Sequence, residues 1–366
     1  MNPKLRKLLS FLFILVSVGT VVIIAFSNPE MKNAWEAISK LSLPWIGGLL
    51  LCWFVYVMFE AMGTWICLRR RGYDISLFRV LGTGLIGMYY SNITPGASGG
   101  QPMQVYQFHK WRVPVGRATA ALTIHFHCFQ IMLLVFDVVL FTVYHKFVLA
   151  ELGPNLPILI VGFIFNVILV SGSLMIAFYQ RPVRWLVKKA GALLRRFNIG
   201  NPEKLERAAD GMADGFYTGM RELASNRAEV ARQVIIASVR VVCLMSVMYF
   251  IYRGLGLREH SYGKILTMGC MQYTSAAYTP LPGASGAQEG VFGLYFAGIL
   301  PDALLLSGLL AWRFVTYYMI LIVGFIVTTA MGMRHTSVEE AEAEVADELS
   351  REDTIVKSRL TPPPKD

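Results

Sequence analysis

The sequence predicts an all-α integral membrane protein with about six full spans and two inverted re-entrant hairpins of broken helix. Two observations predict this class. Of the 366 residues, 55% are hydrophobic and only 16% are charged, whereas soluble domains carry about 25% charged residues. In addition, one seven-residue phrase occurs twice within apolar sequence, as PGASGGQ at residues 95–101 and as PGASGAQ at residues 282–288.

The repeated phrase predicts two breaks in membrane-embedded helices. Proline and glycine interrupt helices, and hydrocarbon tolerates interrupted backbone only where protein or water shields it. Two breaks at matching places in the two halves of a chain are typical of a transporter's binding site. The alternative is a pair of ordinary Pro-Gly turns between helices, although the identity continues past Pro-Gly through Ser and Gln.

Apolar runs predict the full spans. The first run, 8–26, follows Lys4, Arg6 and Lys7 and has 19 residues. A signal-peptide core has about 7–15, so an uncleaved anchor is favoured over a signal peptide. Further spans are predicted at 43–68, 118–144, 158–179, 234–252 and 303–333.

Charge predicts how the two broken segments are inserted. Residues 78–110 have cationic flanks on both sides, with Arg69–Arg71 before and Lys110 and Arg112 after. Both flanks are therefore expected in the cytoplasm, which makes the segment a hairpin of two half-helices. Each half of about ten residues would reach about 15 Å, half of a bilayer core. Three predicted spans separate this hairpin from the second, 263–299, which should enter from the opposite side.

Residues 1–335 are predicted to form the membrane domain, in the plasma membrane with both termini cytoplasmic. Residues 181–232 hold 11 basic and six acidic residues. They predict amphipathic helices lying on anionic headgroups, or else a solvated connector. Residues 336–366 are predicted to be an acidic cytoplasmic tail, partly disordered.

Several function classes are disfavoured by the sequence. The five cysteines have no metal-ligand or CxxC spacing, so no metal and no cofactor is expected. The chain has no Walker loop, no HExxH and no nucleophile elbow, so an enzyme is not predicted. A basic run interleaved with aromatics is also missing, and no nucleic acid partner is expected.

In each repeated phrase Ser is followed three residues later by Gln, which is the spacing of a capping box. Ser98 with Gln101 and Ser285 with Gln288 are therefore predicted to start two half-helices whose positive ends converge on a phosphate. The alternative is that the caps only satisfy the breaks. The predicted headgroup site comprises Pro95, Gly96, Ser98, Gly99, Gly100, Gln101, Pro282, Gly283, Ser285, Gly286, Gln288 and Glu289.

Charged residues inside apolar segments are functional candidates. Arg240 and Arg313 could each bind a lipid phosphate bidentately, or form a structural pair with Glu60, Asp137 or Glu289. His127, Gln130 and Asp137 share one face of the 118–144 helix, whereas His125 points the other way. With Glu60 they are a candidate polar relay for protons, although simple hydrogen bonds between helices are favoured.

Residues 92–102 and 279–290, together with the order of spans, resemble the transmembrane domain of lysylphosphatidylglycerol synthases, a flippase-like family. The resemblance covers nearly all of residues 1–335. It implies movement between leaflets of an anionic or aminoacylated phospholipid, such as lysylphosphatidylglycerol, or of a related lipid-linked headgroup. In full-length synthases, which confer resistance to cationic peptides, a soluble domain aminoacylates phosphatidylglycerol. Here 33 residues follow the last predicted span, so that activity is not carried over.

A lipid translocase is therefore the expected function, with membrane phospholipid as substrate and anionic lipid headgroups as contacts. One alternative is a lipid-modifying transferase of the phosphatidylglycerol lysyltransferase type, which would need His127, Asp137 or Glu289 as acid or base. Another is a non-transporting scaffold for a lipid synthase. Possible protein partners are a second copy of the chain or such a synthase.

Overall fold

The computed structural model describes residues 41–179, 202–276 and 281–332, and the single residues 181, 185, 189, 279, 338, 340, 341, 343 and 344. The described residues form helices joined by short turns, and none of them forms a strand, which confirms the all-α class. Three predictions lie wholly or partly outside them: the span at 8–26, the first part of the basic segment at 181–232, and most of the acidic tail at 336–366.

Long apolar helices confirm the membrane character of the chain. Within the described residues, four helical stretches are long and apolar enough to cross a membrane: Leu43–Arg69, Val115–Phe178, Arg227–Gly254 and Asp302–Ala330. The first is α3 and the third is α10, while the second contains α6 (Val115–Leu152) and α7 (Leu156–Phe178). The fourth joins α13 (Asp302–Arg313) to α14 (Met319–Ala330). Tyr144, the predicted end of a span, is instead a kink within α6.

The two repeated phrases form the same turn. α4 (Leu77–Ile93) and α5 (Gly100–Lys110) are joined by a 3-10 turn at Pro95–Ala97, and α11 (Tyr262–Ala276) and α12 (Ala287–Phe296) by one at Pro282–Ala284. Gly96 and Ala97 have φ of 58° and 57°, and Gly283 and Ala284 have 60° and 51°. A left-handed alanine is uncommon, so its recurrence shows that the repeated sequence encodes a repeated backbone.

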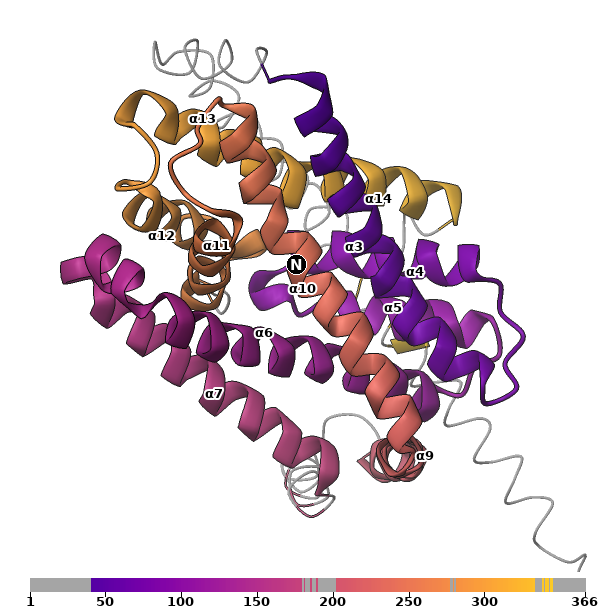
Figure 1. The fold of residues 1–366 in the computed structure, drawn as a ribbon. Helices are drawn as coiled ribbons and strands as arrows, with labels where there is room; N and C mark the ends of the chain where they lie inside the picture. Colours follow the sequence, from indigo (N-terminus) through magenta and orange to yellow (C-terminus); the bar gives the residue numbers. More distant parts are fainter. Residues whose placement is uncertain are drawn as a thin grey trace, which may run out of the picture.

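These two turns meet inside the helical bundle. They pack against each other, and the second turn also packs against α4. In Figure 1, α4 and α5 lie on one side of α10, and α11 and α12 lie on the other. One buried apolar cluster surrounds the first broken segment and a second cluster surrounds the other, while α6 and α10 contribute to both. The breaks therefore lie where two halves of the core join.

The flanks of the broken segments lie at opposite ends of α10. Arg117 Nη1 donates to Tyr73 Oη at 3.2 Å, which brings the chain before α4 next to the start of α6. Arg70 lies 3.8 Å from Glu229 in the first turn of α10. At the other end of α10, the backbone N–H of His260, just before α11, donates to Tyr252 Oη at 3.1 Å. The two broken segments thus enter the bundle from opposite ends, as the predicted inverted arrangement requires, and the side of the membrane from which each one enters stays a prediction.

The amphipathic helix predicted in the basic connection is α9 (Pro202–Ser225), which packs along α6 and against α7. Tyr217 Oη lies 3.0 Å from the Ile176 carbonyl and 3.2 Å from that of Tyr179, near the end of α7. Gly116 and Gly215 bring the backbones of α6 and α9 so close that a side chain at Gly116 would strike α9. The described apolar face of α9 is thus covered by protein.

The inverted arrangement predicts where introduced cysteines react. In a variant without the native cysteines, Lys110→Cys and Ser261→Cys should be labelled from opposite sides of intact cells by a membrane-impermeant maleimide. The two positions flank broken segments that enter from opposite ends of α10. Labelling of both positions from the same side would contradict the inverted arrangement.

Candidate functional site

A cavity of about 650 Å³ lies between the two turns. Side chains from α3, α6, α10 and α13 complete its wall, and both turns contribute to it. The structure brings many of the predicted site residues together here. The predicted residues that line the cavity are Glu60, Gly96, Ser98, Gln101, Gln130, Arg240, Gly283, Gln288 and Arg313.

Other predicted site residues are not part of the cavity wall. Among them are the prolines and several glycines, which shape the turns, as well as two polar residues of α6. These residues are Pro95, Gly99, Gly100, His127, Asp137, Pro282, Ser285, Gly286 and Glu289.

Arg240 of α10 is buried in the cavity wall with 5% of its surface exposed. It forms an ion pair with Glu60 of α3, and its Nη1 lies 2.9 Å from His125 Nε2 of α6. Its guanidinium also stacks 4.5 Å from the centre of the Phe129 ring. The Nε of Arg240 has no hydrogen-bond partner in the described part of the chain.

Arg313, the last residue of α13, is the matching cation of the second half, with 6% of its surface exposed. Its Nε donates to Glu289 Oε1 at 2.6 Å, and its Nη1 donates to the Gly283 carbonyl at 3.2 Å. Its Nη2 has no partner among the described residues. A π-helical turn, Phe314–Tyr318, follows directly and contributes Tyr317 to the cavity. Such bulges are frequent at functional sites.

Both arginines thus form the structural pairs that were the predicted alternative, Arg240 with Glu60 and Arg313 with Glu289. Neither pair uses all of the guanidinium N–H groups, however. A buried N–H without an acceptor is costly, so each arginine keeps the capacity to bind an anion.

The predicted serine caps are wrong. α5 begins at Gly100 with Gly99, not Ser98, at the N-cap position, and the Gly99 N–H donates to Thr94 Oγ1 at 2.9 Å. α12 begins at Ala287, after Gly286 rather than Ser285. Ser285 Oγ donates to the Pro282 carbonyl at 2.9 Å. The left-handed Gly-Ala pair delays the start of each half-helix, so that each serine falls before the cap position.

The N-terminus of α12 is already occupied by a carboxylate. Glu289 Oε2 accepts from the Gly286 N–H at 2.6 Å, and a negative charge is stabilised at this end of a helix. At the same offset in the first repeat stands Pro102, which has no N–H. The two half-helix ends are therefore not equivalent, and the arginines are the stronger anion partners in the cavity.

The polar stripe on α6 is divided among different neighbours. His127 Nε2 lies 2.9 Å from Ser173 Oγ on α7, and its Nδ1 lies 2.7 Å from the Thr123 carbonyl. Asp137 Oδ2 accepts from Thr274 Oγ1 of α11 at 2.5 Å. The structure therefore shows hydrogen bonds between helices for these two residues rather than a His127–Asp137 relay.

Sequence reasoning missed His125 and Gln272. His125 was placed away from the polar stripe, yet its Nε2 lies next to both members of the Arg240–Glu60 pair. Gln272 of α11 donates to Gln288 Oε1 of α12 at 2.6 Å and so ties the two half-helices across the second break. Their only sequence signal is that each is a polar side chain within an apolar run.

The fold and the cavity define a polytopic α-helical membrane protein built around two inverted broken-helix segments and two buried arginines. The chain belongs to the family of the lysylphosphatidylglycerol synthase transmembrane region, whose model matches residues 8–324. This match includes both repeated phrases and every residue that lines the cavity. A comparison with curated proteins finds no match. Family membership connects the chain with membrane lipids.

The corrected caps predict unequal effects of two similar substitutions. Thr94→Val should destabilise the protein by about 0.5–2 kcal/mol, since Thr94 accepts from Gly99 and also donates to the Tyr90 carbonyl. Ser98→Ala, the matched control in the same turn, should have a smaller effect. Thermal unfolding in detergent measures both. A larger loss for Ser98→Ala would contradict the conclusion that Thr94, rather than Ser98, stabilises the start of α5.

Proposed function

We propose that this protein is a lipid translocase, which moves an anionic or aminoacylated phospholipid, or a related lipid-linked headgroup, between the leaflets of the plasma membrane. The observation that carries the proposal is the pair of buried arginines in one cavity, each with an N–H group that has no partner among the described residues. Lysylphosphatidylglycerol is one substrate of this class.

A lipid phosphate supplies the acceptors that these arginines lack. Guanidinium groups match phosphate oxygens in a planar, bidentate geometry, and such charge-assisted bonds are stronger than neutral ones. Arg240 belongs to α10, whereas Arg313 ends α13, the helix after the second broken segment, and holds the turn of that segment through the Gly283 carbonyl. A phosphate bound to both arginines would therefore connect α10 with the turn of the second broken segment.

The cavity has room for a headgroup and adjoins a groove for acyl chains. Its volume of about 650 Å³ lies within the range of about 300–1,000 Å³ that is usual for small-molecule sites. A second hollow, of about 410 Å³, lies between α7 and α11 and is lined by exposed apolar side chains such as Val161 and Phe165. Thr279 lines both spaces. A headgroup in the cavity could thus leave its tails on the lipid-facing side.

The arrangement supports binding more directly than catalysis. Glu60 and Glu289, the carboxylates next to the cavity, are each held in an ion pair with an arginine. A transferase would need an acid or base free to exchange protons with the reacting atoms. If the purified chain formed a new lipid when supplied with phospholipid and an aminoacyl donor, the transferase would replace the translocase as the explanation.

Replacing either arginine should slow lipid movement. We expect Arg240→Gln and Arg313→Gln each to lower the initial rate of translocation in vesicles by about tenfold or more, since a hydrogen bond to a charged group contributes about 1.5–3 kcal/mol. Lys at either position should restore the rate only in part, because it lacks the planar fork. Arg253→Gln is the matched control, as Arg253 lies on α10 but outside the cavity wall.

A structural role must be separated from a role in binding. Removing one arginine leaves a buried carboxylate without its partner, which by itself destabilises a protein. The double variant Arg240→Gln with Glu60→Gln avoids that unpaired charge. It should unfold near the wild-type temperature and still translocate slowly. Wild-type rates in this variant and in Arg313→Gln would show that neither guanidinium is needed.

A further inference from the structure

We propose that His125 takes up one proton when the lipid phosphate binds, so that lipid movement is coupled to proton movement in the same direction. This inference rests on the proposed function and adds its coupling ion. It is carried by the hydrogen bonds of His125, which fix the state of both ring nitrogens.

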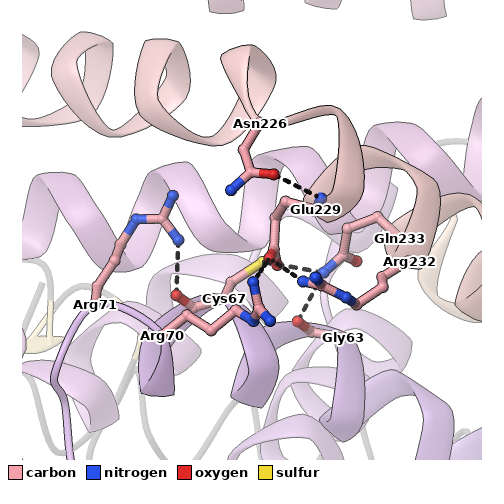
Figure 2. A network of polar contacts seen from close by, with 8 residues as sticks. All are labelled: Gly63, Cys67, Arg70, Arg71, Asn226, Glu229, Arg232 and Gln233. Carbon is pink, nitrogen blue, oxygen red and sulfur yellow. Dashed lines mark hydrogen bonds and ion pairs between the residues drawn. The ribbon is translucent and has the colours of Figure 1, made fainter.

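The first ring nitrogen is fixed by Gln233 of α10. Gln233 Nε2 lies 2.8 Å from the Gly63 carbonyl and 3.0 Å from Cys67 Sγ, both on α3, as Figure 2 shows. A carbonyl oxygen only accepts, so the amide nitrogen must face Gly63 and the amide oxygen must face His125. Because that oxygen lies 3.0 Å from His125 Nδ1, Nδ1 carries a hydrogen.

This contact requires glycine at position 63. A side-chain carbon there would strike the ring of His125 and would also crowd Gln233 Oε1. The three elements α3, α6 and α10 thus come close enough at this point to hold the imidazole in one orientation.

The second ring nitrogen lies between two competing partners. Arg240 Nη1, which can only donate, lies 2.9 Å from His125 Nε2. Nε2 must therefore be unprotonated, and the imidazole is neutral. Glu60 Oε2, which as a carboxylate can only accept, lies 3.5 Å from the same nitrogen. A proton on Nε2 would exchange the bond from Arg240 for a bond to Glu60.

This exchange links the proton to the phosphate. When Nε2 is protonated, Arg240 Nη1 loses its acceptor and becomes available to a ligand, as Nε already is. A phosphate that accepts from Arg240 favours the protonated imidazole, and the protonated imidazole favours the phosphate. Such coupling is reciprocal by thermodynamic necessity.

The charges around the cavity also favour the uptake of one proton for each bound phosphate. Arg240 and Arg313 are balanced by Glu60 and Glu289 while His125 is neutral. A bound phosphodiester adds one negative charge, and one proton that His125 takes up from the aqueous phase restores neutrality. Uncompensated charge is costly in such an interior, so proton and phosphate should enter and leave together.

The other titratable groups near His125 are already engaged or are uncharged. Tyr56 of α3 stacks with the Arg240 guanidinium, 5.3 Å from its ring centre, and Tyr273 of α11 lines the same cavity. Behind Gln233, buried Glu229 is compensated by Arg232 at 2.8 Å and Arg70 at 3.8 Å. Cys67 lies between them, with its Sγ 3.4 Å from Glu229 Oε1 (Figure 2). This group holds Gln233 in place from the end of α3.

The test measures lipid and proton together. The full-length protein is reconstituted into phosphatidylglycerol-containing vesicles with a fluorescent anionic phospholipid and an entrapped pH indicator. Initial rates are measured over about pH 5 to 8, the range in which histidine titrates, with and without an imposed pH gradient. For the wild type we expect a gradient parallel to lipid movement to raise the rate several-fold, and about one proton to enter with each lipid.

Two variants on α6 distinguish a role of His125 in proton coupling from a purely structural role. In His125→Gln, whatever rate remains should no longer respond to the gradient. His127→Gln is the matched control, since His127 is also buried on α6 but bonds to Ser173 and lies outside the cavity wall, and it should respond as the wild type does. If His125→Gln does not fold, indicator-detected proton uptake by the wild type on adding the phospholipid in detergent replaces it.

Several results would overturn the inference. One is a wild-type rate that is independent of the gradient with no proton uptake, which would leave the lipid translocase intact. Another is a gradient response that survives in His125→Gln. Failure to move the lipid under any condition would instead overturn the proposed function itself.

Discussion

The contact between two breaks in the helical backbone is the constraint on which the rest of the structure depends. Each break exposes polar backbone groups that an intact helix would satisfy, and an apolar surrounding offers them few partners. Local side chains satisfy part of this need, with Thr94 accepting at the first break and Glu289 at the second. The turns then pack against each other, and α6 and α10 extend through both halves of the core around them. The cavity is the space that this arrangement leaves.

The chemistry of the cavity follows from its charges. Arg240 and Arg313 are each paired with one carboxylate, so the site is neutral when empty and yet retains unpaired guanidinium N–H groups. An anion can therefore bind without displacing either pair completely. His125 lies where the first pair can be rearranged, since both Arg240 and Glu60 approach its Nε2. Phosphate binding and proton uptake are thus proposed to act through the same side chains.

Composition and the repeated phrase were sufficient to predict an all-α membrane protein with two matching breaks, because both depend on apolar length and on Pro-Gly interruptions that the sequence states directly. They were insufficient for the caps. The left-handed φ at Ala97 and Ala284 moves each helix start past its serine. A left-handed alanine cannot be predicted from the residue pattern, because alanine rarely adopts this conformation. Helical periodicity likewise separated His125 from His127, but it could not say which face meets the cavity, because that depends on how α3 and α10 pack. The carboxylate partners of both arginines were among the predicted alternatives, and only the structure could choose between them.

The most direct test of the central claim is a cryo-electron microscopy structure of the protein in nanodiscs that contain an anionic phospholipid. The proposal predicts density for a headgroup between the two turns, with phosphate oxygens about 2.7–3.2 Å from nitrogens of both Arg240 and Arg313 and with acyl chains extending toward the groove between α7 and α11. Lipid bound only on the outer surface, with the cavity closed by rearranged side chains, would contradict it.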